Sequence, residues 1–206
     1  MRTAPQKIYP QYNAPKIRTT EFSLMNKNLV FLNGFMGAGK SKIGPIVADK
    51  LNCPFFDSDK IIEEATGKTI SDIFTDQGEE TFRKMEQAIL FQLIGNNNKA
   101  VIALGGGALM NPDNKKMADK KGTVVYIKSS PEEIFKRVKK TSKRPLLNIP
   151  RDENFETNLL IRIEELLKDR KDVYESAAVI IERDGFDPPQ VAEMILTELE
   201  QFGKKT

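Results

Sequence analysis

The stretch that decides the fold is GFMGAGKS, residues 34–41. A glycine, four residues and then Gly-Lys-Ser is the spacing of the Walker A phosphate-binding loop of nucleoside triphosphate-binding proteins. The apolar run NLVFLN (28–33) precedes the loop and predicts a strand, and a helix is predicted after it, through about residue 51. Phosphate binding needs this order, because the helix N-terminus points its N–H groups at the anion. A chance glycine turn is the less favoured alternative.

Each part of the motif has its own task at a bound nucleotide. The glycines let backbone N–H groups turn inward around phosphate oxygens, Lys40 neutralises the β- and γ-phosphates, and Ser41 offers a hydroxyl to Mg²⁺. The motif does not say whether water or a substrate receives the phosphoryl group. The predicted nucleotide contacts in this stretch are Gly37, Ala38, Gly39, Lys40, Ser41 and Lys42.

Short apolar segments alternate with helical patterns along the rest of the chain. Strands that are apolar throughout and separated by helices indicate a parallel sheet covered on both faces. We therefore predict an α/β fold, a three-layer αβα sandwich with a central, mainly five-stranded parallel sheet. The predicted strands are 28–33, 53–57, 100–104, 123–128 and 177–182, and the predicted helices after the first are 59–65, 69–76, 78–94, 130–140, 152–171 and 189–202.

Composition narrows the class of protein. The chain has 206 residues, enough for one domain with a full core, and its lone Cys53 cannot form an internal disulfide, which fits a reducing, cytoplasmic setting. No apolar run approaches the roughly 20 residues that span a bilayer. Histidine is absent, so acid-base chemistry falls to carboxylates, lysines or tyrosines.

The net charge of +3 lies entirely in the N-terminal segment. Residues 1–24 carry four basic residues and one acidic residue, so residues 25–206 are neutral overall. A neutral folded part argues against nucleic acid as a partner. We expect residues 1–25 to be a flexible extension, with a plastid transit peptide as the minor alternative, and residues 26–206 to form the domain. We expect a monomer that does not bind membranes.

The stretch CPFFDSDK, residues 53–60, runs an apolar strand into two carboxylates. In extended backbone, Asp57 and Asp59 would lie on the same side about 6 to 7 Å apart, which is unfavourable unless a cation or ligand lies between them. Parallel topology brings Asp57 close to the phosphate-binding loop, where it would face Mg²⁺, while Asp59 would face an acceptor hydroxyl. On spacing alone, an N-cap role for Asp59 is equally favoured.

Six motifs occur in the order and approximate spacing seen in shikimate kinases, and they run from about Val30 to Tyr174. The chain resembles this family through GFMGAGKS, FFDSDKIIEEATGKTISDIF, GEETFRKME, ALGGGA, KRPLL and DRKDVY. The resemblance implies a P-loop kinase of the nucleoside-monophosphate-kinase type, with a substrate-binding helical region near 58–95 and a mobile lid near 138–150. It also implies transfer of the ATP γ-phosphate, with Mg²⁺, to the 3-hydroxyl of shikimate in chorismate and aromatic amino acid biosynthesis.

The resemblance also implies roles for single residues. Asp59 would contact the reacting hydroxyl, Asp57 and Ser41 would hold Mg²⁺, and Lys40 with Arg144 of the lid would stabilise charge on the transferred group. The shikimate carboxylate would meet Arg83, with Glu86 orienting it, although a surface ion pair is the plain alternative for these two. The remaining implied contacts are Gly105, Gly106, Gly107 and Arg170 for shikimate, and Arg137 and Arg144 for ATP.

The chain departs from the family pattern at two positions. Lys42 stands where a Thr or Ser usually bonds the α-phosphate, and Asp172 stands where a proline is common, which would loosen a turn beside Arg170. Two rival functions stay open. One is a kinase of the same scaffold acting on another polyol acid or a nucleotide, and the other is a non-catalytic ATP-binding module. Arg83 and Arg170 favour a carboxylate substrate over a nucleotide, and the combined donor and acceptor residues argue against the non-catalytic module.

Overall fold

The computed structural model describes residues 29–139 and 145–205. Its five strands are β1 (Leu29–Asn33), β2 (Phe55–Asp57), β3 (Ala100–Ala103), β4 (Gly122–Lys128) and β5 (Val179–Glu182). Its helices are α1 (Lys40–Lys50), α2 (Ser58–Thr66), α3 (Ile70–Asn96), α4 (Pro112–Lys121), α5 (Pro131–Val138), α6 (Phe155–Glu175) and α7 (Pro188–Lys205), with short 3₁₀ turns η1 (Ala108–Met110) and η2 (Pro145–Leu147).

The strands form one parallel sheet in the order β2-β3-β1-β4-β5. β1 is the central strand, since β3 and β4 pair with its two sides, and it is buried along its whole length. In a parallel sheet all strands end at the same edge, so the loop after β1 shares that edge with the residues that follow β2, β3 and β5. The sheet thereby gathers distant parts of the chain around the phosphate-binding loop.

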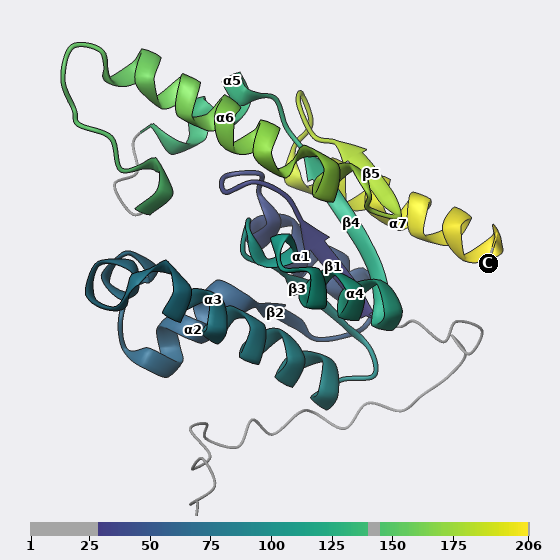
Figure 1. Ribbon diagram of the computed structural model, residues 1–206. Helices are drawn as coiled ribbons and strands as arrows, with labels where there is room; N and C mark the ends of the chain where they lie inside the picture. Colours follow the sequence, from purple (N-terminus) through teal and green to yellow (C-terminus); the bar gives the residue numbers. More distant parts are fainter. Residues whose placement is uncertain (1–28, 140–144, 206) are drawn as a thin grey trace, which may run out of the picture.

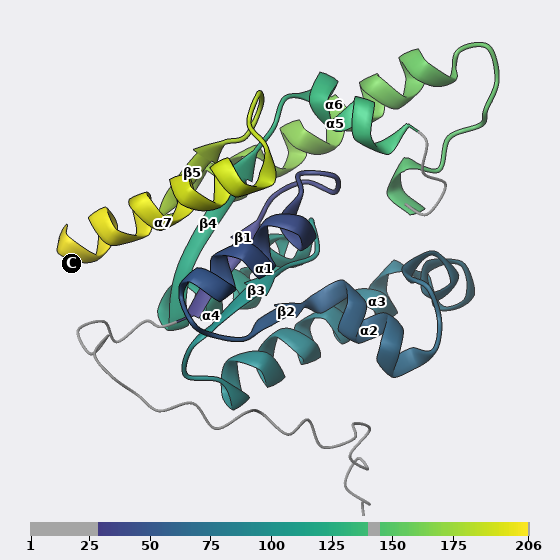
Figure 2. The ribbon, with the colours of Figure 1, turned by 180° about the vertical axis from the view of Figure 1, so that it is seen from behind.

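Helices cover both faces of the sheet, as Figures 1 and 2 show from opposite sides. Alternate residues of β1 separate the two cores, because successive side chains of a strand point to opposite faces. Phe31 packs with buried residues of α3 and α4, while Leu32 packs with buried residues of α1 and α7. A third cluster joins Tyr126 of β4 to α5 and α6. The predicted three-layer α/β fold with a five-stranded parallel sheet is confirmed.

Several predicted elements differ in detail from the structure. The sequence assigned no helix between the third and fourth strands, but α4 begins there with Asn111 as its N-cap and Pro112 in its first turn, a favourable start. The predicted helices 69–76 and 78–94 are one long element, α3, which is interrupted at Gly78 where φ is 80°. Asp172 lies inside α6, so the turn expected beside Arg170 is wrong.

Two predictions fall mainly on residues outside this description. The extension 1–25 is one, and the central part of the lid near 138–150, with Arg144, is the other. Of the helices that the structure describes, not one combines the length and the apolar character needed to cross a membrane.

Candidate active site

The loop between β1 and α1 has the backbone shape that its glycines predict. Gly37 has φ of 84° and Gly39, which begins α1, has φ of 99°, a region that residues with a side chain rarely adopt. A Cβ atom at Gly37 would also lie only 2.8 Å from Cγ1 of Val138 on α5. The loop is held at its start by Asn33, whose buried Oδ1 accepts a hydrogen bond from Gly34 N at 2.9 Å. The glycines are therefore required by conformation and by space.

Lys40 and Ser41 lie at the beginning of α1 and make short polar contacts. The Lys40 Nζ donates to the carbonyl oxygens of Gly34 at 2.6 Å and Phe35 at 3.1 Å, so the ammonium group lies across the loop. The Ser41 hydroxyl donates to Oδ2 of Asp57 at 2.5 Å. These contacts place an ammonium, a hydroxyl and a carboxylate at one edge of the sheet.

The two aspartates after β2 are arranged differently from the sequence expectation. β2 ends at Asp57 and α2 begins at Ser58, so Asp57 and Asp59 do not lie in one extended segment. Asp57 is the N-cap of α2, and its Oδ1 accepts from Lys60 N at 3.4 Å. Asp59 lies in the first helical turn, so the N-cap alternative for Asp59 is wrong. The helical turn brings the carboxylate of Asp59 close to Gly105, which follows β3.

The three glycines after β3 form the meeting point of the predicted substrate residues. A Cβ atom built at Gly105 would collide with Oε1 of Glu86 and lie 2.8 Å from Oδ1 of Asp59. A Cβ atom at Gly107 would lie 2.7 Å from a guanidinium nitrogen of Arg83. The backbone of this loop is anchored to α2, because Gly105 N donates to the buried Ser58 hydroxyl at 3.1 Å. Side chains at these positions would therefore displace the charged groups.

Arg170 connects this glycine loop to the phosphate-binding loop. It is 6% exposed, its Nη1 donates to Gly106 O at 3.2 Å, and its guanidinium carbon lies 5.6 Å from the ring centre of Phe35. Tyr174, one turn later on α6, donates its hydroxyl to the same carbonyl at 2.5 Å. Tyr174 is also buried in the cluster that joins β4, α5 and α6, and its spacing of four residues from Arg170 brings both side chains to one face of α6.

Arg83 and Glu86 on α3 form a largely buried ion pair. Nη1 of Arg83 lies 2.8 Å from Oε2 of Glu86, whose side chain is 2% exposed, and Nη2 lies 2.8 Å from the exposed Glu79. Two carboxylates thus hold one guanidinium in place beside Gly107. The surface-pair alternative is wrong, because Glu86 is buried.

Burial raises the pKa of Glu86 to about 7, against the opposing effect of Arg83, and the nearby charge of Asp59 raises it further. Between pH 4.5 and 7 the folded chain holds a proton that the unfolded chain has released. The contribution of this group to stability is therefore complete below pH 4.5 and is lost as the pH rises through 7.

We expect Glu86→Gln to flatten the pH dependence of stability, because glutamine has no proton to lose. Relative to this variant, the wild-type chain should lose up to about 1.4 kcal/mol of unfolding free energy per pH unit in that window. Urea unfolding at several pH values measures the difference. Glu79→Gln, which alters the exposed partner of the same arginine, is the control. Parallel curves for wild type and Glu86→Gln would contradict the assignment.

The remaining predicted nucleotide residues lie around the phosphate-binding loop. Arg137 on α5 donates to Glu133 at 2.9 Å and to the Ser129 hydroxyl at 3.3 Å, and its Cβ is 3.9 Å from a Cβ built at Gly37. Lys42 is exposed in the first turn of α1. Arg183, which sequence reasoning did not select, lies against Gly39. The only feature of the sequence that indicated Arg183 is its position as a basic residue directly after the last predicted strand.

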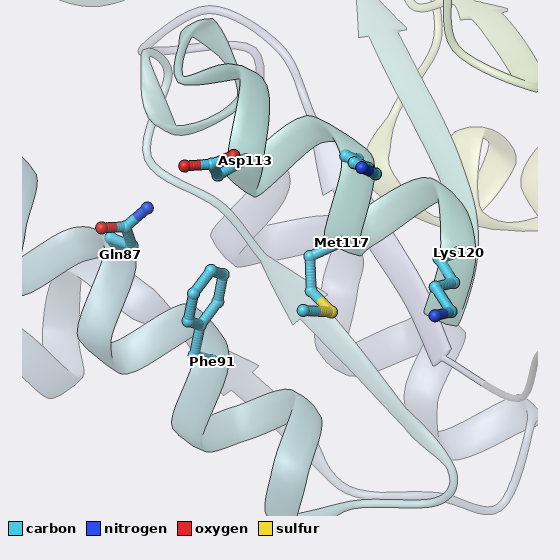
Figure 3. Close-up of a pocket in the computed structure, with 6 residues that line it drawn as sticks. Gln87, Phe91, Asp113, Met117 and Lys120 are labelled. Atoms are coloured by element: carbon cyan, nitrogen blue, oxygen red, sulfur yellow. The ribbon is translucent and has the colours of Figure 1, made fainter.

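A hollow of about 440 Å³ lies elsewhere, between α3 and α4. Figure 3 shows Gln87 and Phe91 on one helix facing Asp113 and Met117 on the other. None of the predicted site residues lines it.

The described residues are chemically suited to bind a Mg²⁺ ion whose other ligands are the phosphates of a nucleotide and water. Mg²⁺ prefers oxygen ligands and usually keeps several waters beside one or two carboxylates and substrate phosphates. The Ser41 hydroxyl and the Asp57 carboxylate supply such oxygens side by side. Within residues 29–139 and 145–205, no cluster of three or more Asp, Glu or Cys side chains could hold an ion by itself.

Comparisons with known proteins show that the chain is similar to shikimate kinases. The family model described as shikimate kinase matches residues 36–200. A shikimate kinase from Thermodesulfovibrio yellowstonii is 41% identical over 176 residues, which are 85% of this chain and 96% of that protein. One from Legionella pneumophila is 40% identical over 178 residues, 86% of this chain and 97% of that protein.

Solved structures give the same result. Shikimate kinase from Acinetobacter baumannii, in complex with shikimate, has a TM-score of 0.76 at 36% identity and covers 85% of this chain and 94% of its own. A gluconokinase from Sinorhizobium meliloti, at 17% identity and a TM-score of 0.54 over 87% of this chain and 95% of its own, shares the fold alone. By sequence and by structure, the chain belongs to the shikimate kinase family of ATP-dependent kinases.

Proposed function

We propose that this chain transfers the γ-phosphate of ATP to the 3-hydroxyl of shikimate, which gives 3-phosphoshikimate and ADP in aromatic amino acid biosynthesis. One observation supports the substrate above all others. The guanidinium groups of Arg83 and Arg170 and the carboxylate of Asp59 surround Gly105–Gly107, next to the phosphate-binding loop. A small acid with hydroxyl groups matches two cations and one anion, because guanidinium forks pair with carboxylates and a carboxylate accepts from a hydroxyl.

The two loops are close enough for direct transfer between bound substrates. A Cβ atom built at Gly106 would lie 3.3 Å from Met36 N and 3.4 Å from Gly34 O. Phosphoryl transfer needs positioning and charge stabilisation more than covalent chemistry, because the transition state is loose. Neighbouring donor and acceptor loops provide the positioning.

Within this reaction each residue has a proposed role. Asp59 orients the attacking hydroxyl and accepts its proton, while Lys40 turns from the loop carbonyls to the transferred phosphate. Residues 37–42 bind the nucleotide phosphates, and Arg137 lies at the adenine side. Arg144 of the lid remains a proposal from the family resemblance. We also propose that residues 1–25 form an extension to the 26–206 domain.

Ser41 and Asp57 would hold Mg²⁺, which neutralises charge on the β- and γ-phosphates when it is bound. We expect Ser41→Ala to raise the Mg²⁺ concentration needed for half-maximal activity by about tenfold, because one oxygen ligand and one orienting hydrogen bond are lost. Titration of activity with Mg²⁺ at saturating ATP measures this. EDTA should abolish ADP release by the wild-type chain. An unchanged Mg²⁺ requirement in the variant would remove Ser41 from the site.

A coupled assay of ADP release on the purified protein tests the function. ADP should appear with shikimate and ATP, and far more slowly with gluconate, CMP or water as the acceptor. Equal or faster release with gluconate or CMP would assign the site to another acceptor. ATP binding without acceptor-dependent release would instead support a non-catalytic module.

A further inference from the structure

Arg183 is a buried cation at the phosphate-binding loop to which the proposed mechanism gives no task. It follows β5 directly and is 8% exposed. A Cβ atom built at Gly39 would lie 3.1 Å from its Nε and 3.5 Å from its Nη2, so the guanidinium lies against the residue that begins α1. The residue after the last strand thus places a positive charge beside the N-terminus of α1, where backbone N–H groups point toward a bound anion.

A short turn fixes the backbone of Arg183. Its N–H donates to Lys128 O at 2.9 Å, and its carbonyl accepts from Phe186 N at 3.2 Å. Gly185 has φ of 85°, the left-handed conformation that closes such a turn. The backbone that carries the guanidinium is therefore held in place before any ligand binds.

In the part of the chain that the structure describes, the guanidinium of Arg183 forms no ion pair. Among residues 29–139 and 145–205, its Nε has no hydrogen-bond partner. The adjacent carboxylates make other contacts: Glu182 pairs with Lys128 at 2.8 Å, and Oδ2 of Asp184 accepts from Ser130 N at 2.7 Å. Oδ1 of Asp184 has no hydrogen-bond partner among the described residues. Burying a cation without a partner costs several kcal/mol, which the fold would tolerate if an anionic ligand supplies the missing charge.

We propose that Arg183 binds the nucleotide, donating hydrogen bonds to a phosphate oxygen of the ADP or ATP held by residues 34–41. The inference rests on the proposed function, because that function makes the anion a nucleotide phosphate. It adds a cation from the last strand to those of the loop and the lid. A guanidinium suits the task, because its planar fork can reach two oxygens at once.

Titration calorimetry with ADP and with adenosine tests the proposal on the full chain. Arg183→Met keeps the length of the side chain and removes the charge. We expect ADP binding to weaken roughly 10- to 100-fold, the effect of one or two charge-assisted hydrogen bonds, and adenosine binding to stay within about twofold. Lys50→Met, which removes an exposed charge at the far end of α1, is the control and should leave both unchanged.

Two results would overturn the proposal: an ADP affinity within about twofold of wild type, or an equal loss for ADP and adenosine, which would indicate a structural role. If Arg183→Met does not fold, Arg183→Lys decides, because it keeps the charge but loses the fork. It should weaken ADP severalfold and adenosine not at all, and unchanged ADP binding would overturn the proposal. A wild-type chain that binds ADP but does not phosphorylate shikimate would refute the proposed function alone.

Discussion

Asp59→Asn should lower kcat for shikimate phosphorylation by about 100-fold or more, the scale on which a positioned acid-base group contributes to catalysis. Asparagine keeps the size of the side chain but cannot accept the proton of the attacking hydroxyl. Asp59 lies against Gly105, in the glycine loop whose neighbours are assigned to the acceptor. We therefore expect ADP affinity to stay within about twofold of wild type, measured by calorimetry beside steady-state kinetics.

Stability effects should not obscure this result. A carboxylate in the first turn of α2 stabilises the helix by about 0.3–1 kcal/mol, and the loss of this amount leaves a folded protein. Asp49→Asn, an exposed change on α1, is the control for an altered net charge. If kcat of Asp59→Asn equals that of wild type, the carboxylate has no part in aiming or deprotonating the acceptor.

The phosphate-binding loop could be predicted in detail because its information is local. Eight consecutive residues specify the turn, the lysine and the hydroxyl, and the flanking strand and helix follow from simple periodicity. The alternation of strands and helices likewise predicted the parallel sheet. These features depend on neighbours in sequence, so no tertiary contact was needed to find them.

The rest of the site depends on how separate elements meet. Asp57 was expected in an extended pair with Asp59, but β2 ends at Asp57 and α2 begins directly at Ser58, because Asp57 caps that helix. The burial of Glu86 could not be inferred from its spacing to Arg83, since the same spacing is common on exposed helices. Arg183 was missed because its approach to Gly39 requires the order of strands in the sheet.

Arg83 tests how the acid is held, and its removal should raise KM for shikimate by roughly 10- to 100-fold with little effect on KM for ATP. Arg83→Met is the preferred change, because methionine is unbranched like the arginine stem and removes only the guanidinium, whose carbon lies 5.2 Å from the ring centre of Phe82. Lys84→Met, which removes the neighbouring exposed cation that pairs with Glu80, is the matched control and should change neither KM.

Arg83→Met alone cannot separate a loss of substrate contact from a loss of stability, because it also removes the cation that pairs with the buried Glu86. Above pH 7, where Glu86 is ionised, breaking this buried ion pair costs about 3–5 kcal/mol. Arg83→Met should therefore be destabilised at that pH, and partial unfolding alone would weaken binding. Adding Glu86→Gln removes the unpaired charge and should restore much of that stability. Shikimate binding should remain weak in the double variant, since the guanidinium beside Gly107 is still absent. Recovery of shikimate affinity together with stability would show that Arg83 supports the fold and does not bind the substrate.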